Sequence, residues 1–284
     1  MEEFELPLVF FTVLSQWAVG IVLVITLLEW IKPDYLEKQK LEIFRVPALT
    51  ALPLAVIATL ASMLHMGYPY KSYLTITGFQ HSWLSREIIA IIILNATLAA
   101  FTWIWWKHIN NSSLRKWIGT LSSVIGIATI CVSAQVYYQM LIHPTWHSWT
   151  TFASFILTGG IIGAMYVYYF ISRSKEEEHP LRLFAILIGG ILIMMVIVLG
   201  VFSQNIFIGV EGAEAVGLTF SSSLFWIRIV FSLLVPAGLL LYLFNSKKQT
   251  NPTFALMIAL LVVVGELSGR MLFYYTVVSQ QPWF

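Results

Sequence analysis

Two residues that can exchange protons, His65 and Glu87, stand at the edges of successive apolar segments of the sequence. His65 ends the run LASMLH, and Glu87 lies near the start of the run SREIIAIIIL. Histidine titrates near neutral pH, so it can accept a proton from a hydroxyl group, and a nearby carboxylate can orient the imidazole and stabilise its charged form. The pair predicts acid–base chemistry on a membrane-dissolved substrate. Quinol oxidation is such a reaction, because two protons must leave as two electrons depart.

The composition around these residues is that of a membrane protein. Hydrophobic residues make up 58% of the chain and charged residues 11%, and the mean hydropathy is +0.82. A soluble domain carries about 25% charged residues. We predict an all-α protein with a single domain over residues 1–284, a bundle of eight helices that are each long enough to cross a bilayer. The predicted helices span about 5–31, 46–66, 86–106, 117–141, 151–171, 183–203, 223–244 and 254–277.

The basic residues predict the orientation of the bundle. Lys and Arg concentrate in cytoplasmic loops, and the odd-numbered connections between the predicted helices hold most of the 16 basic residues of this chain. Both termini are therefore expected on the periplasmic side. The residues in these connections are Lys32, Lys38, Lys40, Arg45, Lys107, Arg115, Lys116, Arg173, Lys175, Arg182, Lys247 and Lys248.

Ionisable residues inside a membrane are costly, so each one is a candidate for function. The predicted helices place His65 and Glu87 at a similar depth near the outer surface, beneath an external loop. Most of the other polar candidates also fall in the outer half of the bundle. Three of them are weaker candidates for lining a quinol pocket: Gln16, Gln135 and Arg228.

Structural interpretations compete with these functional ones. Glu266 and Arg270 are spaced i,i+4, so we expect them to form an ion pair within the eighth helix. Arg228 is expected to extend outward to the membrane surface. A secondary transporter that used Glu266 and Arg270 as a substrate or proton site remains an alternative function, and a purely structural anchor is another.

The proton-exchanging pair also has a structural alternative. Ser85 can cap the third helix, and Glu87 in its first turn would then complement the helix dipole. His65 could hydrogen-bond a lipid headgroup at the membrane surface. Both interpretations stay open on the sequence alone.

The sequence argues against a resident metal centre. Cys131 is the only cysteine, so the protein cannot hold an iron–sulfur cluster or a structural zinc ion by itself. A haem-bearing cytochrome b needs paired histidines within its helices, and His65 is the only one of the six histidines that falls in a predicted helix. We expect no metal and no haem here, so any electron acceptor must lie on a partner.

Three motifs resemble the DmsC family, the membrane anchor subunits of bacterial dimethyl sulfoxide reductase. They are ELPLVFFTVLSQWAVG at the start, ASMLHMGYP at the end of the second helix and SWLSREI at the start of the third. The motif likeness covers the first third of the sequence, and length and topology agree beyond it. The family's functional His and Glu match His65 and Glu87.

The resemblance implies a partnership and a substrate. It implies an anchor in the bacterial inner membrane that oxidises menaquinol and passes the electrons to an iron–sulfur subunit with four clusters. A molybdopterin catalytic subunit would complete a heterotrimer. The anchor itself would not carry out the terminal reduction, and it would contact lipid but no nucleic acid. The sequence does not distinguish dimethyl sulfoxide from trimethylamine N-oxide or another terminal acceptor.

Overall fold

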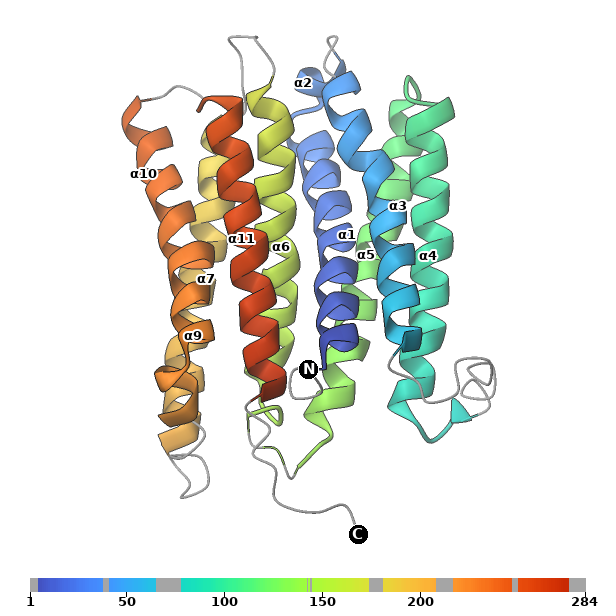
Figure 1. The fold of residues 1–284 in the computed structure, drawn as a ribbon. Helices are drawn as coiled ribbons and strands as arrows, with labels where there is room; N and C mark the ends of the chain where they lie inside the picture. Colours follow the sequence, from blue (N-terminus) through green and yellow to red (C-terminus); the bar gives the residue numbers. More distant parts are fainter. Residues whose placement is uncertain are drawn as a thin grey trace.

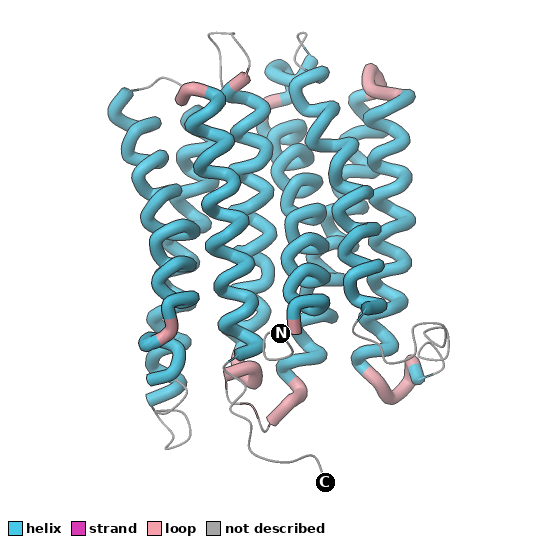
Figure 2. The backbone as a smooth tube through the Cα atoms, viewed as in Figure 1, coloured by secondary structure: helices cyan, strands magenta, loops and turns pink. Residues whose placement is uncertain are grey.

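The computed structural model describes residues 5–37, 41–64, 78–141, 143, 145–173, 181–207, 217–246 and 250–275. Within these ranges the protein forms helices and no strand, and the helices run side by side as an upright bundle (Figures 1 and 2). Eight of the described helical segments are long and apolar enough to cross a membrane. The predicted all-α, eight-span fold is therefore confirmed.

The helix bounds agree with the predicted ones to within a few residues. The short helix α2 lies in the first connection, and the seventh span consists of three consecutive helical segments. The helices are α1 (Leu6–Ile31), α2 (Pro33–Glu37), α3 (Leu41–Leu64), α4 (Trp83–Lys107), α5 (Ser112–Tyr138), α6 (Trp149–Ser172), α7 (Leu181–Phe207), α9 (Ser223–Arg228), η3 (Ile229–Leu234), α10 (Val235–Ser246) and α11 (Pro252–Tyr275).

Polar side chains set the starts of several helices. The N-cap of α4 is Ser82, whose side chain accepts a hydrogen bond from the backbone N–H of Ser85. The expectation that Ser85 caps this helix is therefore wrong, and Glu87 is the fifth residue of α4 rather than a member of its first turn. An acid in that position is less able to complement the helix dipole, which acts within the first turn.

The seventh span is interrupted by the π-helical segment η3. Pro236 follows as the second residue of α10, and a proline cannot donate the hydrogen bond that an α-helix would direct to the carbonyl four residues earlier. The distortion next to Pro236 therefore takes the form of a wider turn just before it. Such π-helical turns occur often at functional sites, and Arg228 immediately precedes this one.

The centre of the bundle is a close contact between α1 and α6, which lie next to each other in Figure 1. A methyl group added at Gly20 would overlap the carbonyl oxygen of Gly159, and one added at Gly163 would overlap the backbone of Gly20. Glycines allow such backbone approaches between membrane helices. The small-residue motif GGIIGA (159–164) thus lets α6 pack directly on α1.

Glu87 near the start of α4, Gln135 near the end of α5 and Arg228 in α9 lie toward one end of the bundle. In Figure 1, α3 ends and α4 begins at the lower end, where the mark of the N-terminus also lies. The helices α6 and α9 also begin at this lower end. The side of the membrane on which this end lies remains a prediction from the basic residues.

Candidate functional site

Glu87 is buried inside the bundle although it carries a carboxylate. Only 5% of its surface is exposed, and its Oε1 atom has no hydrogen-bond partner among the described residues. The side chain of Ser133 on α5 lies within hydrogen-bonding reach of the carboxylate. A buried and partly unsatisfied carboxylate is costly, so such a group calls for a ligand or a functional explanation.

Two tyrosines extend this polar site toward α11. The hydroxyl oxygens of Tyr137 on α5 and Tyr274 on α11 are 2.6 Å apart, and both residues are buried. Glu87 is close enough to interact electrostatically with both phenols, and Thr12 on α1 is within hydrogen-bonding reach of Tyr274. We call Thr12, Glu87, Ser133, Tyr137 and Tyr274 the Glu87 cluster.

A small cavity adjoins this cluster between α1, α4 and α5. Thr12 and Ser133 line it together with Gln16, Ser15 and Thr129, and the apolar walls come from neighbouring residues of the same helices. Gln16 therefore lies beside the Glu87 cluster, and its part in a quinol pocket stays a prediction. His65 lies outside the described residues, and α3 ends at the residue before it.

The structure pairs Glu266 and Arg270 differently from the expectation. Oε2 of Glu266 accepts a hydrogen bond of 2.6 Å from Thr158 and lies 3.4 Å from Nη2 of Arg228. Arg270 instead donates a hydrogen bond of 2.9 Å to Oε1 of Gln16. No ion pair joins Glu266 to Arg270 in the described part of the protein, so the predicted intrahelical pair is replaced by contacts between helices.

Packing explains the changed partners. The guanidinium carbon of Arg270 lies 3.6 Å from the centre of the Phe155 ring on α6. This contact directs the Arg270 side chain toward α1. The side chain of Arg228 crosses α11 at Gly269, where any Cβ atom would overlap it. Arg228 thus turns inward to Glu266, and the expectation that it extends outward is wrong.

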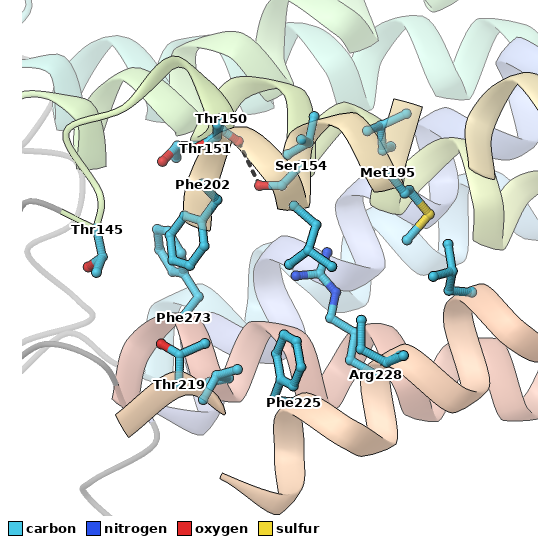
Figure 3. Close-up of a pocket in the computed structure, with 17 residues that line it drawn as sticks. Thr145, Thr150, Thr151, Ser154, Met195, Phe202, Thr219, Phe225, Arg228 and Phe273 are labelled. Carbon is cyan, nitrogen blue, oxygen red and sulfur yellow. Dashed lines mark hydrogen bonds between the residues drawn. The ribbon is translucent and has the colours of Figure 1, made fainter. Parts of the chain in front are cut away.

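Arg228 also lines a larger pocket between α6, α7, α9, η3 and α11 (Figure 3). This pocket and the small cavity beside the Glu87 cluster have no lining residue in common. Gln135 is half-buried on α5 and lines neither of them. The three weaker candidates are therefore not brought together in one site.

The connection between α5 and α6 closes the same end of the bundle. Nε1 of Trp146 donates a hydrogen bond of 2.9 Å to the carbonyl of Phe273, and the two rings stack with their centres 5.2 Å apart. His143 is 8% exposed and packs against Trp146 with ring centres 4.9 Å apart. Burial lowers the pKa of His143, because the charged imidazolium loses its hydration.

Sequence reasoning missed several polar members of the site. Ser133, Tyr137 and Thr12 were not singled out, and neither were Tyr274 and Thr158. Their spacing carried a usable signal, because residues four apart share a helix face. Such rows are Thr12 and Gln16 on α1, Thr129, Ser133 and Tyr137 on α5, and Glu266, Arg270 and Tyr274 on α11.

Ligands for a metal ion are not assembled within the described ranges. No group of three or more His, Cys, Asp or Glu side chains is placed there so that it could hold one. The side chains that the structure gathers are instead hydroxyls, phenols, one carboxylate and an amide. They can donate and accept hydrogen bonds and transfer protons.

A family model described as "DMSO reductase anchor subunit (DmsC)" matches residues 1–275. The sequence is also similar to a component of the anaerobic dimethyl sulfoxide reductase of Haemophilus influenzae, with 32% identity over 283 residues that cover 95% of this protein and 94% of the relative. The corresponding component of the Escherichia coli enzyme is 29% identical over 284 residues, again with 95% and 94% coverage.

A more distant likeness covers part of the sequence. A component of the sulfite dehydrogenase of Allochromatium vinosum is 26% identical over 141 residues, which are 46% of this protein and 43% of that one.

Proposed function

Because the chain belongs to the DmsC family of dimethyl sulfoxide reductase anchor subunits, we propose that it oxidises menaquinol at the Glu87 cluster together with His65. The electrons would pass to an iron–sulfur subunit with four clusters, and a molybdopterin catalytic subunit would use them. The protein would hold both subunits at the periplasmic face of the bacterial inner membrane. As a multi-pass membrane anchor, it would contribute the quinol site and not the terminal reduction.

The unsatisfied Oε1 atom of Glu87 is the observation that carries this proposal. A quinol hydroxyl could donate a hydrogen bond to this atom. The side chain of Ser133 is within hydrogen-bonding reach of the same carboxylate, and the hydroxyls of Tyr137 and Tyr274 provide further polar groups nearby. These polar groups lie at the bundle end where α3 stops one residue before His65. From the sequence we place His65 at this same end, because it follows directly after the last residue of α3.

The proposed reaction divides into proton and electron transfers that balance. The quinol loses two protons and two electrons and becomes the quinone. His65 accepts the proton of one hydroxyl, and Glu87 orients His65 or relays that proton toward the external surface. His65 then accepts the proton of the second hydroxyl, which leaves by the same route. The two electrons leave for the iron–sulfur partner.

The two rival functions find less support. A transporter would need Glu266 and Arg270 together at one substrate site, but Oε2 of Glu266 contacts Arg228 and Thr158, whereas Nη2 of Arg270 donates to Gln16 on α1. A purely structural anchor would give no reason to bury the carboxylate of Glu87 without a full set of hydrogen bonds. The family membership also favours an anchor over a transporter.

The test compares menaquinol-analogue oxidation by membranes that hold the assembled complex. We expect His65→Leu and Glu87→Gln each to lower the rate by about 100-fold or more, the usual contribution of a general acid or base. Glu42→Gln is the matched control, because Glu42 is an exposed acid in the first turn of α3. The amount of iron–sulfur subunit retained on the membrane reports assembly.

Two outcomes would overturn the assignment of the site. Full activity in both variants would show that neither residue takes part. Loss of activity that merely follows loss of the iron–sulfur subunit would assign them to assembly. In that case, binding of a quinol analogue to the purified anchor variants decides, and unchanged binding would reject the quinol site.

A further inference from the structure

The pocket beside Arg228 is separate from the site proposed above. It encloses about 920 Å³ of space not filled by protein atoms, including the part that opens to the surface. Figure 3 shows Ser154 and Met195 on one side of this space, with Phe225 and Arg228 on the other. The Arg270–Phe155 contact lies between the Arg228 pocket and the Glu87 cluster, since Arg270 interacts with groups of both.

The Arg228 pocket has a polar end and an apolar end. Its hydroxyl groups lie near the end of the bundle, on the first residues of α6 and in the adjoining connections: Thr145, Thr150, Thr151, Ser154 and Thr219. Further along the helices the lining becomes aliphatic, with Leu157 on α6, Met195 and Leu199 on α7, and Leu233 on η3. This gradient suits an amphiphilic ligand whose headgroup lies near the membrane surface.

The charges in the pocket favour a neutral headgroup. Arg228 is already paired with Glu266, and the two charges cancel. An anionic headgroup such as a phosphate would have to approach Arg228 beside the buried carboxylate of Glu266, which would repel it. A neutral carbonyl oxygen meets no such repulsion. The contact to Glu266 occupies one of the five N–H groups of the guanidinium, and others can donate to a ligand.

Aromatic side chains indicate a flat headgroup. Phe202, Phe225 and Phe273 come from three different helices and line the same pocket. Aromatic rings pack well against one another in stacked or edge-on arrangements. A planar ring with carbonyl oxygens could lie against these phenyl groups and still accept a hydrogen bond from Arg228.

We propose that the Arg228 pocket is a second binding site for an isoprenoid quinone. One carbonyl of the quinone accepts a hydrogen bond from Arg228, and the isoprenoid tail follows the aliphatic lining of α7 and η3. No redox step takes place there. This site does not depend on quinol oxidation at the Glu87 cluster, and either site can fail without the other.

The test uses the assembled complex in phosphatidylcholine nanodiscs and a photoreactive azido-naphthoquinone that carries an isoprenoid tail. We expect labelled peptides from α7 and from residues 217–233 after irradiation. Leu199→Trp should fill the pocket and abolish this labelling. Ile193→Trp is the matched control, because it places the same bulk on an α7 residue that is 63% exposed and outside the pocket. Arg228→Gln should weaken the labelling affinity about tenfold through loss of a charged hydrogen bond.

Each possible result bears on the proposal. Labelling that persists in Glu87→Gln and disappears in Leu199→Trp supports a second site. Labelling that disappears in Glu87→Gln and persists in Leu199→Trp overturns it and leaves a single site at the Glu87 cluster. Labelling that unlabelled menaquinone does not compete, but phosphatidylglycerol does, also overturns it and assigns the pocket to a phospholipid. If the Leu199→Trp variant does not assemble, the affinity of the Arg228→Gln variant for the azido-naphthoquinone decides between the two outcomes. An affinity equal to that of the wild type rejects the second site.

Discussion

The guanidinium of Arg270 donates a hydrogen bond of 2.9 Å to Oε1 of Gln16, so the last helix of the bundle is tied to the first. Both side chains are buried. The contact also stands between the two polar regions of the protein, since Gln16 lines the cavity beside the Glu87 cluster and Arg270 is close to Arg228 and Glu266.

Gln16→Leu is expected to lower the free energy of unfolding by about 1–3 kcal/mol, because it leaves a buried donor of Arg270 without its acceptor. The double variant Gln16→Leu with Arg270→Met should cost less than the sum of the two single variants, since no orphaned partner remains. Unfolding in mixed micelles measures each value. Strict additivity would mean that the two residues do not interact.

Gly163→Ala is expected to disrupt the contact between α1 and α6, because the new methyl group would overlap the backbone of Gly20. Separating two central helices should lower the yield of folded protein and its midpoint of thermal unfolding. Gly190→Ala is the control, since a methyl group there meets nothing within 4 Å. Equal behaviour of the two variants would contradict the close contact.

Arg115→Met should destabilise the bundle by about 3–5 kcal/mol, because Glu29 would keep a buried charge without its partner. Nη2 of Arg115 lies 2.8 Å from Oε1 of Glu29, and both side chains are almost fully buried. Arg45→Met breaks an exposed pair with Glu42 and should cost about 0–1 kcal/mol. Chemical unfolding of the purified anchor would compare them, and similar losses would argue against a buried pair.

Acid should loosen the connection between α5 and α6. The pKa of His143 is lowered in the folded protein, so the opened segment takes up a proton at higher pH than the folded one does. The folded segment is therefore favoured above the ordinary histidine pKa of about 6.5 and loses stability as the pH falls below it. Limited proteolysis between α5 and α6 should speed up from pH 7.5 to pH 5.5. His143→Gln should remove this dependence, and an unchanged acid response in the variant would assign it to another group.

Turnover should generate no membrane potential if the quinol site lies at the periplasmic end of the bundle. Protons would then be released on the same side as the electrons are consumed, and no net charge would cross the membrane. Proteoliposomes with the complex in one orientation and a potential-sensitive dye would test this. A potential that grows with turnover would place the Glu87 cluster or the partner on the other side.

The spans were predictable from the sequence because apolar runs of bilayer length leave few alternatives. Glu87 was also recognisable, since a carboxylate at that depth is rare. The partners of Glu266 were not predictable from helix spacing. The i,i+4 rule predicts contacts within one helix only. Arg228 comes from another helix and reaches Glu266 because Gly269 has no side chain in its way. Contacts of this kind depend on which helices meet and at what rotation, and hydropathy does not encode either.

The polar side chains of α1 have a consequence for biosynthesis. Glu29 finds its partner 86 residues later in the sequence, and Gln16 finds its partner 254 residues later. At a translation rate of about 5–20 residues per second, the ribosome needs roughly 13–50 s to make up the second interval. During that time α1 has entered the membrane with polar groups that only later helices can satisfy. An insertion chaperone, or continued contact of α1 with the translocon, would protect these polar groups. Polypeptides that stop before α11 should be degraded by membrane proteases.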